Sequence, residues 1–221
     1  MGYLDDVTLG GSVDSVSCDV AEIRRVGSKM GLVLNPSKCE LIAPKETTVT
    51  DPFLQSFITT EIDNACLIGA PLFPGPALEK TWSDRCDDLS KAVDRLAKFG
   101  SQDALIQLRL SFSAQKVLHL LRCSPSVSHP LLDQFDSLLR SAVQRITNTD
   151  LSDSQWMQAS LPVKDGGLGV RRVSSLSLPA YLASAASSLS LQDAILSNSV
   201  SSASTICTNY QGWKNHDFKK N

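Results

Sequence analysis

Residues 2–11 read GYLDDVTLGG, and this stretch decides how the front of the chain is expected to fold. The residues on either side of Asp5-Asp6 favour extended structure, the aspartates favour a turn, and Gly10-Gly11 closes the segment. Two adjacent aspartates at a turn are either ordinary turn residues or part of a site for a hard divalent cation, which prefers oxygen ligands. The stretch therefore predicts a β-hairpin with a pair of carboxylates at its apex.

An amphipathic helix is expected next, because apolar residues recur at helical spacings between Val13 and Met30. Ser12 is placed to cap its start and Gly31 to end it. Farther on, β-prone runs predict two short strands around an Asn-Pro turn and then a second hairpin, in LVLNPSKCELIA (32–43) and from FITTEI (57–62) to CLIGA (66–70). The chain is therefore expected to be β-rich with one helix up to about residue 75.

After residue 75 the pattern becomes helical. Apolar residues from Trp82 to Leu96 recur every three or four positions, and Gly100 is placed to end that helix. Further helices are predicted by caps, proline stops and apolar spacing, over residues 101–124, 130–146, 152–161 and 173–188. The high serine content from Ala183 onward predicts a loss of order toward the C terminus.

The predicted fold is therefore α+β, with a small antiparallel β piece followed by a mostly helical bundle. Three regions are expected, covering residues 1–75, 76–160 and 161–221. The length of 221 residues and the 42% hydrophobic content are typical of a globular protein that can bury a core.

Charge and cysteine usage narrow the class of protein. The formal net charge of −2 predicts no general attraction to nucleic acid, so such binding would need a local patch. No apolar run of about 18 residues is present, and no secretory leader is recognisable, so neither a membrane span nor secretion is expected. The six cysteines are scattered without a CxxC pair, which favours reduced thiols in an intracellular protein over a zinc module.

Several motifs occur in an order that resembles reverse transcriptases of the non-LTR retrotransposon type. YLDD resembles their YxDD box, MGLVLNPSKCELI (30–42) resembles the next palm motif, and ACLIGAP (65–71) resembles the primer grip. LPVKDGGLGVRR (161–172) and SLPAYLASAASS (177–188) resemble a segment found beyond the thumb in such elements. The resemblance implies a partial palm over 1–75, a thumb-like region over 76–160 and a connector over 161–221.

The resemblance also implies roles for residues of the front hairpin. Asp5 matches the direct ligand of catalytic Mg²⁺, Asp6 matches the second aspartate of the box, and Tyr3 would lie beside the primer terminus and the incoming nucleotide. A second aspartate pair, Asp87-Asp88, lies inside a helical pattern, so an aspartate pair alone does not identify a metal site.

Four residues farther along match other family positions. Lys38 matches a lysine that assists pyrophosphate departure, although an exposed lysine at a strand end is the commoner case. Leu67, Ile68 and Gly69 match the primer grip; considered without the family, they predict a core strand with a turn glycine.

The implied reaction is RNA-directed DNA synthesis, in which two Mg²⁺ ions about 3.5–4 Å apart activate the attacking hydroxyl and stabilise the leaving oxygens. The family also needs fingers and a further palm aspartate upstream of the box, yet only Met1 and Gly2 precede Tyr3. We therefore expect weak Mg²⁺ binding and no RNA copying by this chain alone. An RNA template, a DNA primer and a separate fingers-palm fragment are the implied partners.

Two functions of other classes stay open: a repurposed, non-enzymatic protein that binds through its helices, and a nucleic-acid-binding remnant. Lys91, Arg95 and Lys98 share one helical face that either tracks a phosphate backbone or is an ordinary solvated surface. The glycine-rich residues 166–169 lack the lysine of a phosphate loop and predict a flexible connector. His119 and His129 lack ligand partners at metal spacing, so structural roles are expected.

Overall fold

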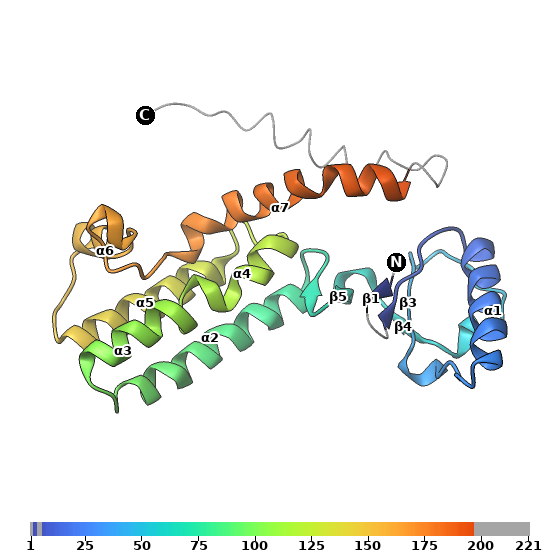
Figure 1. Cartoon of the computed structure of the whole chain (residues 1–221), viewed down its shortest axis with the longest axis horizontal. Helices are drawn as coiled ribbons and strands as arrows, with labels where there is room; N and C mark the ends of the chain where they lie inside the picture. Colours follow the sequence, from blue (N-terminus) through green and yellow to red (C-terminus); the bar gives the residue numbers. More distant parts are fainter. Residues whose placement is uncertain (1, 4–5, 197–221) are drawn as a thin grey trace. The chain divides into compact units, whose positions relative to one another are not determined.

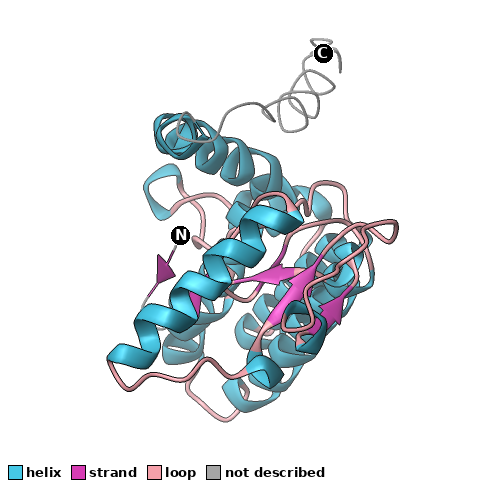
Figure 2. Cartoon of the chain, turned by 90° about the vertical axis from the view of Figure 1, so that its right-hand side faces the viewer, coloured by secondary structure: helices cyan, strands magenta, loops and turns pink. Residues whose placement is uncertain are grey.

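The structure is a computed structural model that describes residues 2–3 and 6–196 (Figure 1). The chain divides into two compact units, Met1–Arg85 and Cys86–Asn221. Figure 2 shows that helices account for most of the described chain and that its strands are short. The α+β class with a small β piece and a helical bundle is confirmed. No helix within the described ranges has both the length and the apolar character that crossing a bilayer requires.

The first unit begins with the predicted antiparallel strand pair. Strand β1 (Gly2–Tyr3) pairs with β2 (Asp6–Val7), and helix α1 (Val13–Lys29) follows. The Ser12 hydroxyl accepts a hydrogen bond from the Ser15 N–H at 3.3 Å, so the predicted N-cap is confirmed. Gly31 lies just beyond the helix and has φ +76°, a left-handed backbone conformation that favours glycine.

The other strand pairings differ from the prediction. Residues 32–35 form no strand, and Pro36–Lys38 form a short 3₁₀ helix, η1, to which the Asn35 side chain contributes a cap. Strand β3 (Glu40–Ile42) pairs in parallel with β4 (Ile58–Thr60). The expected hairpin around the Asn-Pro turn is therefore wrong, because strand propensity does not specify a partner. The intervening residues 43–57 are long enough for the crossover that a parallel pair requires.

The hairpin expected from FITTEI to CLIGA is also wrong, since β4 pairs backward along the chain. Strand β5 (Cys66–Leu67) instead pairs with β6 (Ala70–Pro71) in a tight antiparallel hairpin. Two short 3₁₀ helices, η2 (Leu54–Ser56) and η3 (Ile62–Asn64), complete this part of the unit.

Helix α2 (Pro76–Leu96) contains the boundary between the units, and the remaining helices belong to the second unit (Figure 1). Their order is α3 (Ser101–Gln107), the π-helical segment η4 (Leu108–Phe112), α4 (Ala114–Cys123), α5 (Pro130–Thr147), α6 (Asp153–Ala159), the 3₁₀ helix η5 (Val163–Asp165) and α7 (Val173–Leu196). The predicted capping box at the start of α6 is present: Ser152 and Gln155 each bond to the other's backbone N–H.

The single helix expected over residues 101–124 is interrupted. The segment η4 separates α3 from α4, and Ser113 between them has non-helical dihedrals, φ −80° and ψ −146°. The buried Ser113 hydroxyl donates to the Arg109 carbonyl at 2.8 Å, which satisfies a backbone acceptor freed by the interruption. Gly100, which the sequence predicted at the end of the preceding helix, is the N-cap residue of α3.

Helix α7 extends beyond its predicted end and contains Pro179. The loss of order predicted from Ala183 is wrong for residues 183–196, which are helical; residues 197–221 lie outside the described part of the chain. Helix α7 packs along α4 and α5 (Figure 1). This tertiary packing stabilises a helix whose serine content disfavours it locally.

The core of the second unit consists of side chains that α5 and its neighbours contribute. Phe135, Leu139 and Val143 of α5 are fully buried, and the spacing of these residues lies on one helical face. Other fully buried side chains of this unit are Leu108, Val117, Leu121, Leu132, Val170 and Val173.

Candidate functional site

The front hairpin carries the first group of predicted site residues. Tyr3 of β1 pairs in register with Asp6 of β2, and Asp5 lies outside the described residues. Asp6 therefore begins a strand, whereas the sequence predicted it in the turn. Only residues 4 and 5 connect the two strands, and two residues is the commonest length of a hairpin connection.

The predicted magnesium ligands lie where the structure describes no side chains: Asp5 is outside the described residues, and only the backbone of Asp6 is described. Among the side chains that are described, no group of three or more His, Cys, Asp or Glu could hold a metal ion. Magnesium binding by Asp5 and Asp6 therefore stays a prediction.

Lys38 is the last residue of η1 and is exposed, two positions before β3 begins. The front hairpin, the β3–β4 pair and the β5–β6 pair are three separate two-stranded sheets. Backbone hydrogen bonding within the described chain therefore does not join Tyr3 and Asp6, Lys38, and the 67–69 turn into one sheet.

The 67–69 segment forms the tip of the β5–β6 hairpin. Leu67 is paired with Ala70, and the two central residues both have positive φ, +49° at Ile68 and +71° at Gly69. This is the arrangement of a type I′ turn, which matches the twist of the strands it joins. Positive φ is unusual for a β-branched residue, and the Ile68 side chain is 62% exposed at the tip. The turn thus exposes the apolar side chain of Ile68 at the hairpin tip, on a backbone with an unfavourable φ.

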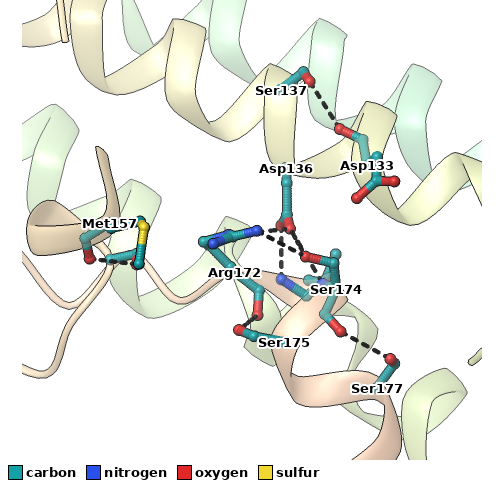
Figure 3. Close-up of polar contacts among 10 residues, drawn as sticks. Asp133, Asp136, Ser137, Met157, Arg172, Ser174, Ser175 and Ser177 are labelled. Atoms are coloured by element: carbon teal, nitrogen blue, oxygen red, sulfur yellow. Dashed lines mark hydrogen bonds and ion pairs between the residues drawn. The ribbon is translucent and has the colours of Figure 1, made fainter. Parts of the chain in front are cut away.

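A buried carboxylate in the second unit was not anticipated. Asp136 of α5 accepts hydrogen bonds at the start of α7 from the Val173 N–H, 2.6 Å, and the Ser174 N–H, 3.2 Å (Figure 3). The Ser174 hydroxyl donates to the same carboxylate. Asp136 therefore satisfies N–H groups that a helix start leaves without intrahelical partners.

The electrostatics of this cluster follow from burial. The Asp136 side chain is 7% exposed, and burial raises the pKa of its carboxyl, against the lowering effect of the hydrogen bonds from Ser174 and Val173. Arg172 lies at the edge, with its Nε 3.8 Å from a carboxylate oxygen and its side chain one third exposed. A sequence signal for this cluster exists: an aspartate stands on the apolar face of α5, next to Phe135 and between Leu132 and Leu139.

The glycine-rich residues 166–169 are closely packed, so the expected flexible connector is wrong. A Cβ on Gly167 would lie 2.1 Å from the Leu161 carbonyl oxygen. The N–H groups of Gly167 and Gly169 donate to the carbonyls of Pro162 and Leu161, at 3.1 and 2.9 Å. These donors are already used within the turn and do not face a phosphate.

The remaining predicted residues lie on helix surfaces or at a helix end. Lys91, Arg95 and Lys98 are exposed along α2 and the turn after it. His129 caps α5, where its Nδ1 accepts from the Leu131 N–H at 3.3 Å, so its structural role is confirmed. His119 is exposed on α4.

Comparison with protein-family models, with curated proteins and with solved structures finds no match to this chain.

Proposed function

We propose that this chain carries the later palm segment, thumb-like region and connector of a reverse transcriptase of the non-LTR retrotransposon type. The ancestral activity is RNA-directed DNA synthesis by two-metal phosphoryl transfer. The observation that carries the proposal is the order of motifs along the first unit: the YLDD box, the Gly-Leu, Asn and Lys positions after a helix, and the Leu-Ile-Gly turn.

The local geometry of these motifs is compatible with the proposal. The box lies at an antiparallel strand pair, and α1 ends two residues before Gly31. The Leu-Ile-Gly segment forms a hairpin tip that presents Ile68 outward, which suits a contact with another molecule. Within the proposal, Asp5 and Asp6 bind Mg²⁺, Tyr3 and the 67–69 turn contact the primer end, and Lys38 assists pyrophosphate departure.

The proposal includes inactivity of the isolated chain. In the family, the two-metal reaction needs a further carboxylate beside the two aspartates that Asp5 and Asp6 match. Activity is proposed to depend on a fingers-palm fragment supplied separately, in an intracellular setting, with an RNA template and a DNA primer.

Primer extension on an RNA template tests this function. The chain alone should incorporate no nucleotide, whereas addition of a fingers-palm fragment should give Mg²⁺-dependent extension. Asp5→Asn in the complemented enzyme should abolish extension, and the matched variant Asp87→Asn, in the exposed aspartate pair of α2, should leave it unchanged. Extension by the chain alone would refute the inactivity, and retained activity in Asp5→Asn would refute the metal role.

A second candidate is a nucleic-acid-binding remnant without activity. Lys91, Arg95 and Lys98 are exposed on one face of α2 and the turn that follows, although Asp94 between them pairs with Arg145 at 2.9 Å. This candidate predicts binding to single-stranded RNA that weakens steeply with salt and is reduced by Lys91→Ala. Binding that does not depend on salt would count against it.

A further inference from the structure

Ser174 occupies a distinctive position at the start of α7. Its backbone N–H and its hydroxyl both donate to the same oxygen of Asp136, while the Val173 N–H donates to the other oxygen (Figure 3). The carboxylate thus holds three donors from two consecutive residues of α7. The contact spans α5 and α7, 38 positions apart in the sequence at Ser174.

A negative charge at the Ser174 hydroxyl would be incompatible with this contact. A phosphoserine carries about −1.5 to −2 charges at pH 7 and offers only acceptor oxygens to a carboxylate. Asp136 is almost fully buried, so water screens the repulsion poorly. The Arg172 guanidinium lies against both groups: its Nε is 3.8 Å from the Asp136 carboxylate, and its Nη2 donates to the Ser174 hydroxyl at 3.5 Å. After phosphorylation, this one guanidinium would face two anions.

The sequence before Ser174 has the charge pattern that basic-directed protein kinases recognise. Arg171 and Arg172 stand three and two positions before the serine. Protein kinases discriminate among substrates through such charge patterns. Both arginines are half-exposed, so a kinase could contact their guanidinium groups.

Ser175 provides an internal comparison. Its hydroxyl donates to the Arg172 carbonyl at 3.0 Å and is exposed, away from Asp136 (Figure 3). Ser177 is buried, and its hydroxyl donates to the Ser174 carbonyl at 2.9 Å. Of these three hydroxyls, only that of Ser174 reaches the carboxylate.

We propose that Ser174 is a phosphorylation site for an arginine-directed serine/threonine protein kinase, and that the phosphate releases the start of α7 from Asp136. The γ-phosphoryl group of ATP moves to Ser174 Oγ, the hydroxyl proton passes to the catalytic base of the kinase, and ADP leaves. Because Ser174 is half-buried, the kinase acts when the first turn of α7 opens, and the phosphate then prevents reclosure. This regulation does not depend on the polymerase ancestry.

The test uses the full chain, a purified arginine-directed kinase and ATP, with the modified residue assigned by mass spectrometry. We expect phosphate on Ser174 and, in the modified protein, amide hydrogen exchange at the start of α7 faster by about tenfold or more. Ser174→Ala should lose this modification, and Ser175→Ala should keep it. Arg171→Ala should slow modification without changing exchange in the unmodified protein, which separates recognition from folding.

Three results would overturn the proposal. They are the absence of phosphate at Ser174, modification confined to Ser175, and a Ser174-phosphorylated protein in which the α7 amides exchange as slowly as before. Ser174→Glu serves as a second variant: exchange at the start of α7 should increase relative to Ser174→Ala, and the matched Ser175→Glu should not cause that increase.

Discussion

Asp136 places a carboxyl group on the buried face of α5, where its oxygens accept hydrogen bonds from the first residues of α7. Burial raises the pKa of this carboxyl above its ordinary value of 3.8, so the folded state takes up the proton more readily than the unfolded state. The stabilisation linked to that proton is complete below the ordinary pKa. It is lost as the pH rises through the raised pKa of the folded state.

Asp136→Asn should remove this pH dependence, because an amide does not titrate. We expect the unfolding free energy of the original chain, relative to that of the variant, to fall as the pH rises from below 3.8 through the raised pKa. Urea unfolding at a series of pH values measures the difference. Asp133→Asn, one turn earlier and exposed, is the matched control and should not alter the profile in this way. Parallel profiles for Asp136→Asn and the original chain would contradict the prediction.

Cys86 is a second residue whose chemistry depends on burial. Desolvation, with a smaller contribution from Asp87, raises the pKa of its thiol to about 11, so the reactive thiolate is scarce at pH 8. Cys18, Cys66 and Cys123 are exposed. Alkylation of the native protein, resolved by residue with mass spectrometry, should label these three cysteines much faster than Cys86. Equal alkylation rates at Cys86 and Cys66 would show that Cys86 is not buried.

Among the elements, the turn between α6 and α7 depends on one close approach of backbone to backbone. The Cα of Gly167 faces the Leu161 carbonyl so closely that a Cβ would lie 2.1 Å from its oxygen. Gly167→Ala should therefore lower the unfolding free energy by about 1–3 kcal/mol, the usual cost of forcing atoms into a packed site. Thermal or urea unfolding measures the loss.

Gly10→Ala is the matched control for that substitution, because a Cβ on Gly10 meets no heavy atom within 4 Å. Its effect should stay within about 0.5 kcal/mol, as for most surface substitutions. If Gly167→Ala were as mild as Gly10→Ala, the tight packing of this turn would be refuted.

Helix boundaries in this chain could be predicted where a local signal specifies them. Ser12 caps α1 and the Ser152–Gln155 box caps α6, and each signal acts within one turn of its own helix. No local signal predicted the interruption of the helix after Gln107. The non-helical residue at the interruption, Ser113, is fully buried, and burial depends on packing against residues far along the chain. The prediction of strand pairing failed for the same reason. Strands β3 and β4 pair with each other although residues 43–57 separate them in the sequence.

The two units of the whole chain differ in how much they bury. Among the described residues, the large, fully buried side chains of the first unit are Leu54, Leu78 and Trp82, whereas the second unit has Phe135, Leu139 and several others. Apolar burial is the main source of folding free energy. The first unit is therefore expected to be the less stable of the two.

Unfolding of the full chain should reflect this difference. Amide hydrogen exchange measured at increasing urea should show α1 losing protection at lower urea than α5. Separate transitions of the two units are the expected outcome, since unequal units break two-state behaviour. A single transition, in which α1 and α5 lose protection together, would contradict the prediction.

The candidate site was only partly accessible from the sequence. The motif order identified Tyr3, Asp6, Lys38 and the 67–69 turn as positions of interest, and the structure places them in or beside three separate sheets. The Asp136 cluster was missed because the pattern of α5 was interpreted through its apolar residues. The role of the aspartate on that face depends on two α7 residues far along the chain, whose N–H groups donate to its carboxylate.

By itself, the sequence determined the α+β class, the places where most helices begin, and the presence of a strand pair around the aspartates. Caps, apolar spacing and turn residues act over a few positions, so the chain carries those instructions locally. Only the tertiary structure decided that β3 and β4 run parallel, that Asp136 is buried against α7, and that residues 183–196 remain helical. These features depend on contacts between distant segments, whose free energy no short stretch of sequence contains.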